Sequence, residues 1–280
     1  MKRLTAPLCI LACLLPALPG AAAPSDAAGR LHDLFAREWE ARLRDNPLLA
    51  SAVGRHEYDA LLPRVTLAEL ERRNADARER LAELAAIDRS RLPAQDVENA
   101  AIWQKQLEDR IAEFDLGAYQ MPFNADSGFH SGFAQLPEQM PFSTVRDYES
   151  YLSRLRAWPR YVGEQIELMR LGIRRGFTVP RVVLAGYDKT ISSHVVDDPE
   201  KSVFYHPFEH FPAGVPAAEQ ARLRRAGREA VLGSVVPGYR TFLDFYESEY
   251  LPHARQTIAA ADLPNGRAFY AHQIERYTTL

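Results

Sequence analysis

The sequence predicts a mainly α protein built as a multi-helix bundle. Apolar residues recur at spacings of three and four through most of the 280 residues, and this spacing gathers them on one face of a helix. Prolines and glycines interrupt the pattern at intervals, where they end helices and form loops. The sequence contains no convincing alternating strand and no internal repeat, so helices packed on helices are the expected architecture.

The N-terminus has the three-part layout of a secretory signal peptide, residues 1–23. A short basic stretch precedes an apolar run over residues 4–18, and small residues follow it. The run is shorter than the roughly 20 residues that a bilayer requires and contains prolines, so no stable membrane anchor is expected. Both cysteines, Cys9 and Cys13, lie in this segment, so residues 24–280 carry no thiol. We expect a periplasmic or secreted bacterial protein.

Residues 10–13 faintly resemble a lipoprotein cleavage box that ends at Cys13. The apolar region continues past this cysteine, which argues against cleavage there. Cleavage near Ala22 or Ala23 is the preferred prediction, and Pro24 leaves the bond itself open.

Composition and charge exclude several classes of protein. The chain has 34 basic and 37 acidic residues, a net charge of −3 and 46% hydrophobic residues. These values exclude a disordered tail, a collagenous repeat and a strongly basic nucleic-acid binder, so no nucleic-acid partner is expected. Removal of the signal peptide leaves 32 basic and 37 acidic residues. Only four of all the basic residues are lysine, and arginine forks suit carboxylate partners.

The first expected helix covers residues 30–43, in which leucines and aromatic residues share one face. Asn46-Pro47 ends it and starts a short helical turn through Val53. These elements form the entry to the bundle.

A capping box then opens a longer helix that runs to about Ile87. The Thr66 hydroxyl can accept from the amide three residues on, while Glu69 reaches back. Pro93 opens another helix, to about Phe114. The two helices should pair as an antiparallel hairpin.

Residues 116–142 lose the helical pattern and are rich in glycine and proline, which predicts a long irregular loop. Thr144 should cap the next helix, with Asp147 at its third position. Pro159 should kink or split this helix before it continues to Gly172.

The remaining chain is expected to be helical with one further loop-rich stretch. A helix should start at Pro180, and residues 192–216 should form the loop. A long helix should cover residues 217–253 and bend at Pro237. After a turn at residues 263–266, the last helix should begin near Arg267.

One short motif imitates a zinc site. His206-Pro207-Phe208-Glu209-His210 matches the pattern H-x-x-E-H, in which two histidines one turn apart bind zinc. That chemistry requires a continuous helix, whereas Pro207 follows the first histidine and Pro212 follows the second. We therefore expect an extended aromatic loop packed on the body.

Other patterns are also better explained by structure than by chemistry. His56-Glu57 begins like H-E-x-x-H, but Ala60 stands where the second histidine is needed. Ser193-His194, Asp197 and Asp198 supply the residue types of a hydrolytic triad, yet neighbours in one loop seldom converge and no nucleophile elbow is present. The glycines of residues 128–132 do not spell a phosphate loop.

A set of short segments, taken in order, resembles the family called domain of unknown function 885. They are Asn46-Pro47, Ala52-Val53-Gly54, Leu84-Ala85-Ala86-Ile87-Asp88 with Leu92, Glu247-Ser248-Glu249-Tyr250-Leu251-Pro252, Leu263-Pro264-Asn265-Gly266 with Tyr270, and Tyr277-Thr278-Thr279. No single segment is diagnostic. The resemblance covers nearly all of residues 24–280.

The resemblance implies a protein about twice this length that is similar to helical, deep-cleft zinc metallopeptidases. The family's His-Glu zinc helix lies in the second half, so residues 24–280 would be an incomplete N-terminal helical portion, truncated before the zinc motif. The fold class is then one part of an elongated, zincin-like cleft protein. We assign no catalytic, cofactor-binding or metal residue here, and we expect zinc only in a full-length member.

The function implied is the cleft-forming half of an exported peptidase-like protein, which is not catalytic alone. Residues 128–141 and 203–212 would face a peptide substrate. The last helix carries Phe269, Tyr270, Ile274 and Tyr277, which should pack on the missing C-terminal half and be exposed in this chain. A non-enzymatic periplasmic binding or interaction module is the alternative, and a truncated gene product without a stable role is a third.

Overall fold

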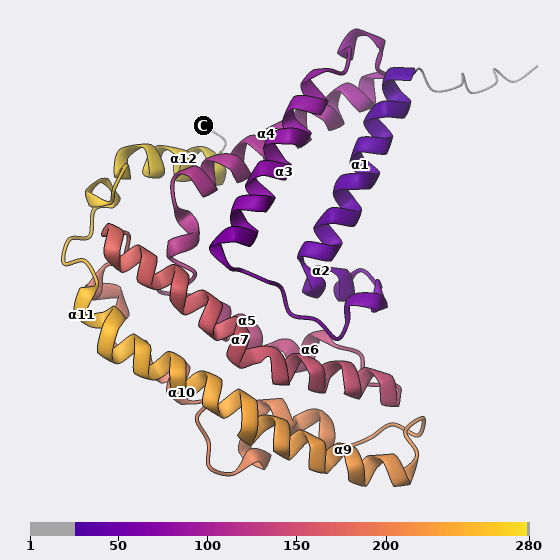
Figure 1. Ribbon diagram of the computed structural model, residues 1–280, viewed down its shortest axis with the longest axis vertical. Coiled ribbons are helices and arrows are strands. Elements are labelled where there is room, and N and C mark those ends of the chain that lie inside the picture. Colours follow the sequence, from indigo (N-terminus) through magenta and orange to yellow (C-terminus); the bar gives the residue numbers. More distant parts are fainter. Residues whose placement is uncertain (1–25, 279–280) are drawn as a thin grey trace, which may run out of the picture.

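The computed structural model describes residues 26–278, which form two helical layers joined at an angle (Figure 1). The arm consists of three long helices, α1 (Asp26–Asp45), α3 (Leu67–Ala85) and α4 (Ala94–Asp115). The second layer, the body, is built on α7 (Val145–Arg175), α9 (Ala217–Ala230) and α10 (Val236–Phe245). Residues 26–278 contain isolated bridges but no strand. The mainly α prediction is confirmed.

Six further α-helices lie within the described residues. They are α2 (Pro47–Ala52), α5 (Phe129–Ala134), α6 (Leu136–Gln139), α8 (Asp188–Ser192), α11 (Leu251–His253) and α12 (Gly266–Thr278). The predicted signal peptide, residues 1–23, lies outside the described residues. None of the described helices is long and apolar enough to span a bilayer.

The arm has a small core of its own. Helices α3 and α4 pack as the predicted antiparallel hairpin, and α1 lies against both. The core residues are Ala27, Leu31, Leu34, Ala77, Leu84, Ile87, Ala100, Trp103, Leu107 and Ile111. Trp39, one of the aromatic residues on the predicted apolar face of α1, remains 41% exposed.

The start of α3 follows one half of the predicted capping box. The Thr66 hydroxyl accepts a hydrogen bond from the Glu69 amide at 3.3 Å. The Glu69 carboxylate does not reach back, because it binds the Arg72 and Arg73 guanidinium groups instead. Ion pairing with two cations outweighs the second capping bond.

The body holds the larger core, which is centred on α7 and dominated by aromatic rings. The rings of Phe133 and Trp158 stack with centroids 3.9 Å apart and planes 6° apart. Tyr239 lies across Trp158, and its hydroxyl donates to the His130 carbonyl oxygen at 2.7 Å. The buried hydroxyl of Tyr239 therefore has a partner, as burial requires.

Two predictions in this region need correction. The stretch 116–142 is not irregular throughout, because α5 and α6 form within it and bury Phe133 and Leu136 in the core. Of the two outcomes expected at Pro159, a kink or a split, the split does not occur, because helix α7 runs without interruption for 31 residues.

The predicted long helix over residues 217–253 is present as one continuous helical path. Two π-helical turns, Val231–Val235 and Tyr246–Tyr250, separate α9, α10 and α11. The first of these turns ends two residues before Pro237. Pro237 has no N–H group to donate, and the wider π-helical turn accommodates the missing hydrogen bond.

Helix α12 leaves the body and lies beside the end of α4 (Figure 1). Phe269 packs edge-on against Phe177. Tyr270, Ile274 and Tyr277 are 55%, 40% and 76% exposed, so the predicted exposed apolar stripe on this helix is confirmed. Phe269 alone of the four predicted residues is half-buried.

Candidate functional site

A pocket of about 510 Å³ opens between the three helices of the arm and the turn at Ala118–Gln120. We call it the arm pocket. Its lining residues are Glu38, Ala41, Arg42, Asp45, Asn46, Leu70, Arg73, Asn74, Asp76, Arg110, Glu113, Phe114, Ala118 and Tyr119. They come from four separate segments, so the pocket exists only in the folded chain.

The apolar part of the arm pocket is formed by Ala41, Leu70, Phe114, Ala118 and Tyr119. The rings of Phe114 and Tyr119 stack with centroids 5.1 Å apart. Apolar and aromatic surface with a few polar groups is the usual composition of a small-ligand pocket.

Every carboxylate that lines the arm pocket already has an arginine partner. Glu38 accepts from Arg110 at 2.8 Å, and Glu113 pairs with Arg276 of α12. The remaining carboxylates share one partner, since Asp45 and Asp76 bind Arg72 at 2.7 and 2.6 Å.

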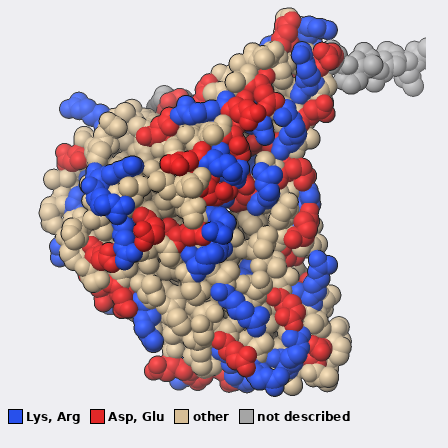
Figure 2. All heavy atoms as spheres, in the orientation of Figure 1, with Lys and Arg blue, Asp and Glu red and all other residues tan. Residues whose placement is uncertain are grey.

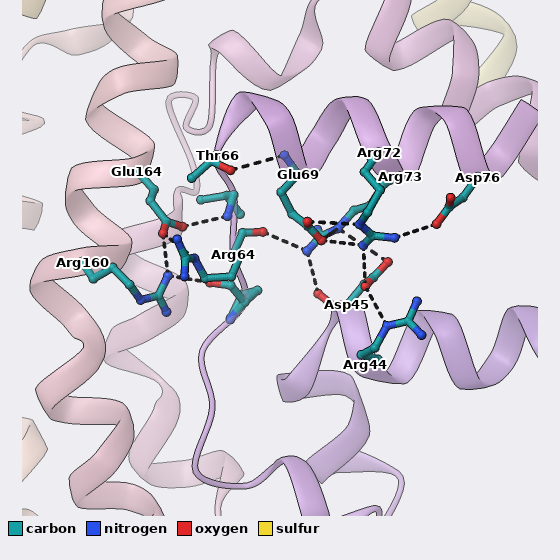
Figure 3. Close-up of polar contacts among 12 residues, drawn as sticks. Arg44, Asp45, Arg64, Thr66, Glu69, Arg72, Arg73, Asp76, Arg160 and Glu164 are labelled. Carbon is teal, nitrogen blue, oxygen red and sulfur yellow. Dashed lines mark hydrogen bonds and ion pairs between the residues drawn. The ribbon is translucent and has the colours of Figure 1, made fainter.

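Figure 3 shows the ion-pair network that forms one wall of the arm pocket. Arg72 lies at its centre and donates to Glu69, Asp45 and Asp76. Arg72 donates hydrogen bonds to the Glu69 carboxylate, and these bonds lower the pKa of Glu69 and raise the pKa of Arg72. Arg73 adds bonds to the Asp45 and Arg64 carbonyl oxygens. The pair formed by Glu69 and Arg72 is therefore charged at neutral pH.

Two polar side chains of the arm pocket remain without a partner among the described residues. Asn74 makes no hydrogen bond, and its Oδ1 atom is buried. Arg42, which is exposed at the rim, makes no ion pair, unlike Arg73 and Arg110 beside it. The Nδ2 atom of Asn74 is not among the buried atoms, so this half-buried side chain can donate to a ligand in the pocket.

A second pocket of about 680 Å³ lies on the other side of the network, between the arm and α7. It shares Asp45 and Arg73 with the arm pocket. Arginines predominate among its charged residues, which are Arg44, Asp45, Arg64, Glu69, Arg72, Arg73 and Arg160.

Arginines of α7 hold the loop that borders this second pocket. Arg160 donates to the Leu62 and Pro63 carbonyl oxygens, both at 3.2 Å, and pairs with Glu164 at 2.9 Å. Glu164 in turn accepts from the Val65 amide at 2.8 Å (Figure 3). The arm and the body are thus joined through backbone groups.

The zinc-like motif does not form a site. His206 and His210 are exposed, and the segment Val203–Phe208 is a 3₁₀ helix whose aromatic residues are buried in the body. The predicted packing of the aromatic residues on the body is confirmed, but the predicted extended loop is wrong, because the segment is helical. Residues 203–212 and 128–141 line neither of the two pockets described above.

The other motifs have structural roles. His56 bonds to Asp59 at 2.9 Å at the end of a short turn. His194 packs against the rings of Tyr239 and Phe204, and Asp198 caps the turn that follows it. Gly128 precedes α5 and approaches Phe123 and His130 closely, which explains the glycine.

Within residues 26–278, no three His, Cys, Asp or Glu side chains are placed to hold a metal ion together. The described residues therefore do not fit a zinc site.

Sequence reasoning did not find the arm pocket. Arg42 and Asn74 lie on ordinary polar helix faces, more than thirty positions apart, and carry no motif. The one available signal was the preponderance of arginine, which pointed to carboxylate partners without placing them.

Two comparisons with known proteins identify relatives of this chain, one for its family and one for its fold. The model of bacterial proteins of unknown function (DUF885) matches residues 47–280. The crystal structure of "the putative lipoprotein from Colwellia psychrerythraea" superimposes with a TM-score of 0.79 at 15% sequence identity. The match covers 91% of this chain and 47% of that protein, so the chain spans about half the neighbour's length. No curated protein matches. The chain belongs to the DUF885 family of bacterial proteins.

Proposed function

We propose that this chain binds peptides in the arm pocket and does not cleave them by itself. The observation that carries the proposal is the pocket's combination of stacked aromatic rings with an unpaired guanidinium and an unpaired carboxamide. Peptides offer apolar side chains together with amide and carboxylate groups, so all three features have a counterpart in one ligand.

We also propose that the chain is exported and corresponds to the N-terminal half of a peptidase-like protein. The signal-like residues 1–23 support export, as does the structural neighbour described as a putative lipoprotein. A zinc-binding second half would pack on the exposed stripe of α12, formed by Tyr270, Ile274 and Tyr277. Zinc and peptide hydrolysis belong to that larger protein in this proposal.

Titration calorimetry of the full chain with short synthetic peptides tests peptide binding. We expect measurable binding that is lost in Ala41→Trp, because the indole fills the arm pocket. Ala36→Trp is the matched control, since Ala36 lies exposed on the same helix and outside the lining. Absence of binding by every peptide would refute the proposal.

Incubation of the same peptides with the chain, with and without added zinc, tests the second part. We expect intact peptides by mass spectrometry in both samples. Turnover with stoichiometric zinc would overturn the assignment as non-catalytic.

The alternative is an exported binding or interaction module unrelated to peptidases. The reading frame downstream of Leu280 separates the two. A frame that continues into a His-Glu-x-x-His helix supports the peptidase half, whereas an authentic stop supports the module.

A further inference from the structure

We infer that the arm pocket recognises the C-terminal end of a peptide whose last side chain is apolar. This inference rests on the proposed peptide-binding function and specifies the ligand for the same pocket. It follows from which of the pocket's groups remain free after all internal pairs have formed.

The charge left over in the arm pocket is positive. Glu38, Asp45, Asp76 and Glu113 are each bound to an arginine, as described above. Arg42 is the lining arginine without an ionic partner among the described residues. A ligand amine would have to break an existing pair, whereas a ligand carboxylate finds a free, planar two-pronged donor.

The carboxamide of Asn74 supplies the second contact. It carries a donor and an acceptor, and neither is used in the folded chain. The Oδ1 atom is enclosed by the protein, whereas Nδ2 is not among the buried atoms and can donate into the pocket. A backbone carbonyl oxygen of the peptide supplies the acceptor for this donor.

The stacked pair of Phe114 and Tyr119, with Leu70 and the two alanines, provides the third contact. These residues leave room for an apolar or aromatic side chain beside the polar groups. A charged side chain would lose its hydration there without gaining a free partner, unless it were acidic and competed for Arg42.

A single phosphate group fits the arm pocket less well. Phosphate sites usually gather several cationic or backbone donors, and Arg42 is a single free cation. The free carboxylate and the apolar side chain are therefore the features that should decide affinity.

Titration calorimetry with matched peptides tests the inference on the full chain. Acetyl-Ala-Phe, with a free C-terminal carboxylate, is the reference ligand. Acetyl-Ala-Phe-amide lacks the negative charge of the carboxylate, and acetyl-Ala-Lys has a charged side chain in place of the apolar one. We expect each change to weaken binding about tenfold or more, which corresponds to about 1.4 kcal/mol. A peptide with a free N-terminal amine and an amidated C-terminus should bind as weakly as the amide.

Variants connect these preferences to residues. The Arg42→Gln variant should bind acetyl-Ala-Phe and acetyl-Ala-Phe-amide with equal affinity. The control Arg30→Gln lies on the same helix but outside the pocket and should keep the difference in affinity between the two peptides. In Asn74→Leu binding of acetyl-Ala-Phe should fall about tenfold. Thermal unfolding should show that Asn74→Leu stays folded, because it removes a buried group that has no partner.

The outcomes separate this inference from the proposed function. If peptides bind but the amide and the lysine peptide bind as well as the reference, peptide binding stands and the inference fails. If the preferences exist but Arg42→Gln and Asn74→Leu leave them unchanged, the assigned contacts are wrong. If no peptide binds, both fail.

Discussion

His130 is fully buried in the aromatic core of the body, and its ring has one hydrogen bond. The Thr190 hydroxyl donates to the Tyr187 carbonyl oxygen, so it accepts from His130 Nε2, which must carry the proton. Nδ1 is left without a partner. Burial, with a smaller contribution from His194, lowers the pKa of His130 from 6.5 to about 4.

The depressed pKa of His130 predicts acid sensitivity. Between pH 6.5 and 4, His130 binds a proton more readily in the unfolded chain than in the folded chain. The free energy of unfolding should therefore decrease as the pH is lowered through this range, by about 3 kcal/mol in total. Urea unfolding at several pH values measures this. His130→Phe should flatten that part of the profile, and replacement of the exposed His206 by Gln should not. A profile unchanged in His130→Phe would contradict the assignment.

Arg154 of α7 is 1% exposed and donates to oxygen atoms of the 47–61 segment. Its partners are the Leu61, Pro47 and Tyr58 carbonyl oxygens, at 2.9, 3.1 and 3.3 Å, and the Ser51 hydroxyl at 2.6 Å. Burial lowers the pKa of Arg154 to about 10, so the side chain remains charged at neutral pH.

Loss of Arg154 should therefore be severe. We expect Arg154→Ala to reduce the free energy of unfolding by about 3–5 kcal/mol, because several buried acceptors lose their donor together. Arg154→Lys should recover part of the loss. Arg156→Ala, exposed on the same helix, should change stability by less than about 0.5 kcal/mol in the same denaturation assay. Equal effects at positions 154 and 156 would refute this role.

At the scale of elements, the contact between α7 and α10 depends on a glycine. A Cβ atom at Gly238 would lie 2.4 Å from Cδ1 of the buried Trp158. Gly238→Ala should therefore cost about 1–3 kcal/mol through overpacking. Gly163→Ala, in α7 with open space around it, should stabilise the chain by about 0.5–1 kcal/mol. Thermal unfolding measures the midpoint temperature of both variants. Midpoints that move in the same direction relative to the unmodified chain would refute the packing argument.

The long helices were predictable because local signals and burial agree along them. Thr144 caps α7 as expected, with Asp147 completing the box. Packing overrules local preference in two places. Helix α7 is not split at Pro159. Helices α5 and α6 form in a segment that is rich in glycine and proline, because Phe133 and Leu136 gain burial there.

At the scale of the whole molecule, the chain has two separate cores, and the arm's is the smaller. Figure 2 shows acidic and basic side chains interspersed over the arm. We expect α3 and α4 to lose hydrogen-exchange protection at lower urea concentration than α7 and α10. Mass spectrometry resolves these segments, and a single concerted loss across all four would contradict two unfolding units.

The arm pocket could not be predicted at any smaller scale. Arg42 and Asn74 are remote in sequence, and what distinguishes them is the pairing of every competing charge around them. That property depends on the packing of the whole arm and not on a local pattern. By contrast, the alternating rings and the prolines did predict that the aromatic residues of segment 203–208 pack on the body.

The joint between the layers also bears on how the sequence can vary. Arg154 and Arg160 bind mainly carbonyl oxygens, and every amino acid carries one. Exposed positions of the segment they hold, such as Leu61, can therefore change side chain without loss of these bonds, whereas the buried Asp59 and Leu62 cannot be exchanged so freely. Mutational tolerance should be high at the exposed positions and low at the two arginines, and a deep mutational scan of folded yield measures this difference.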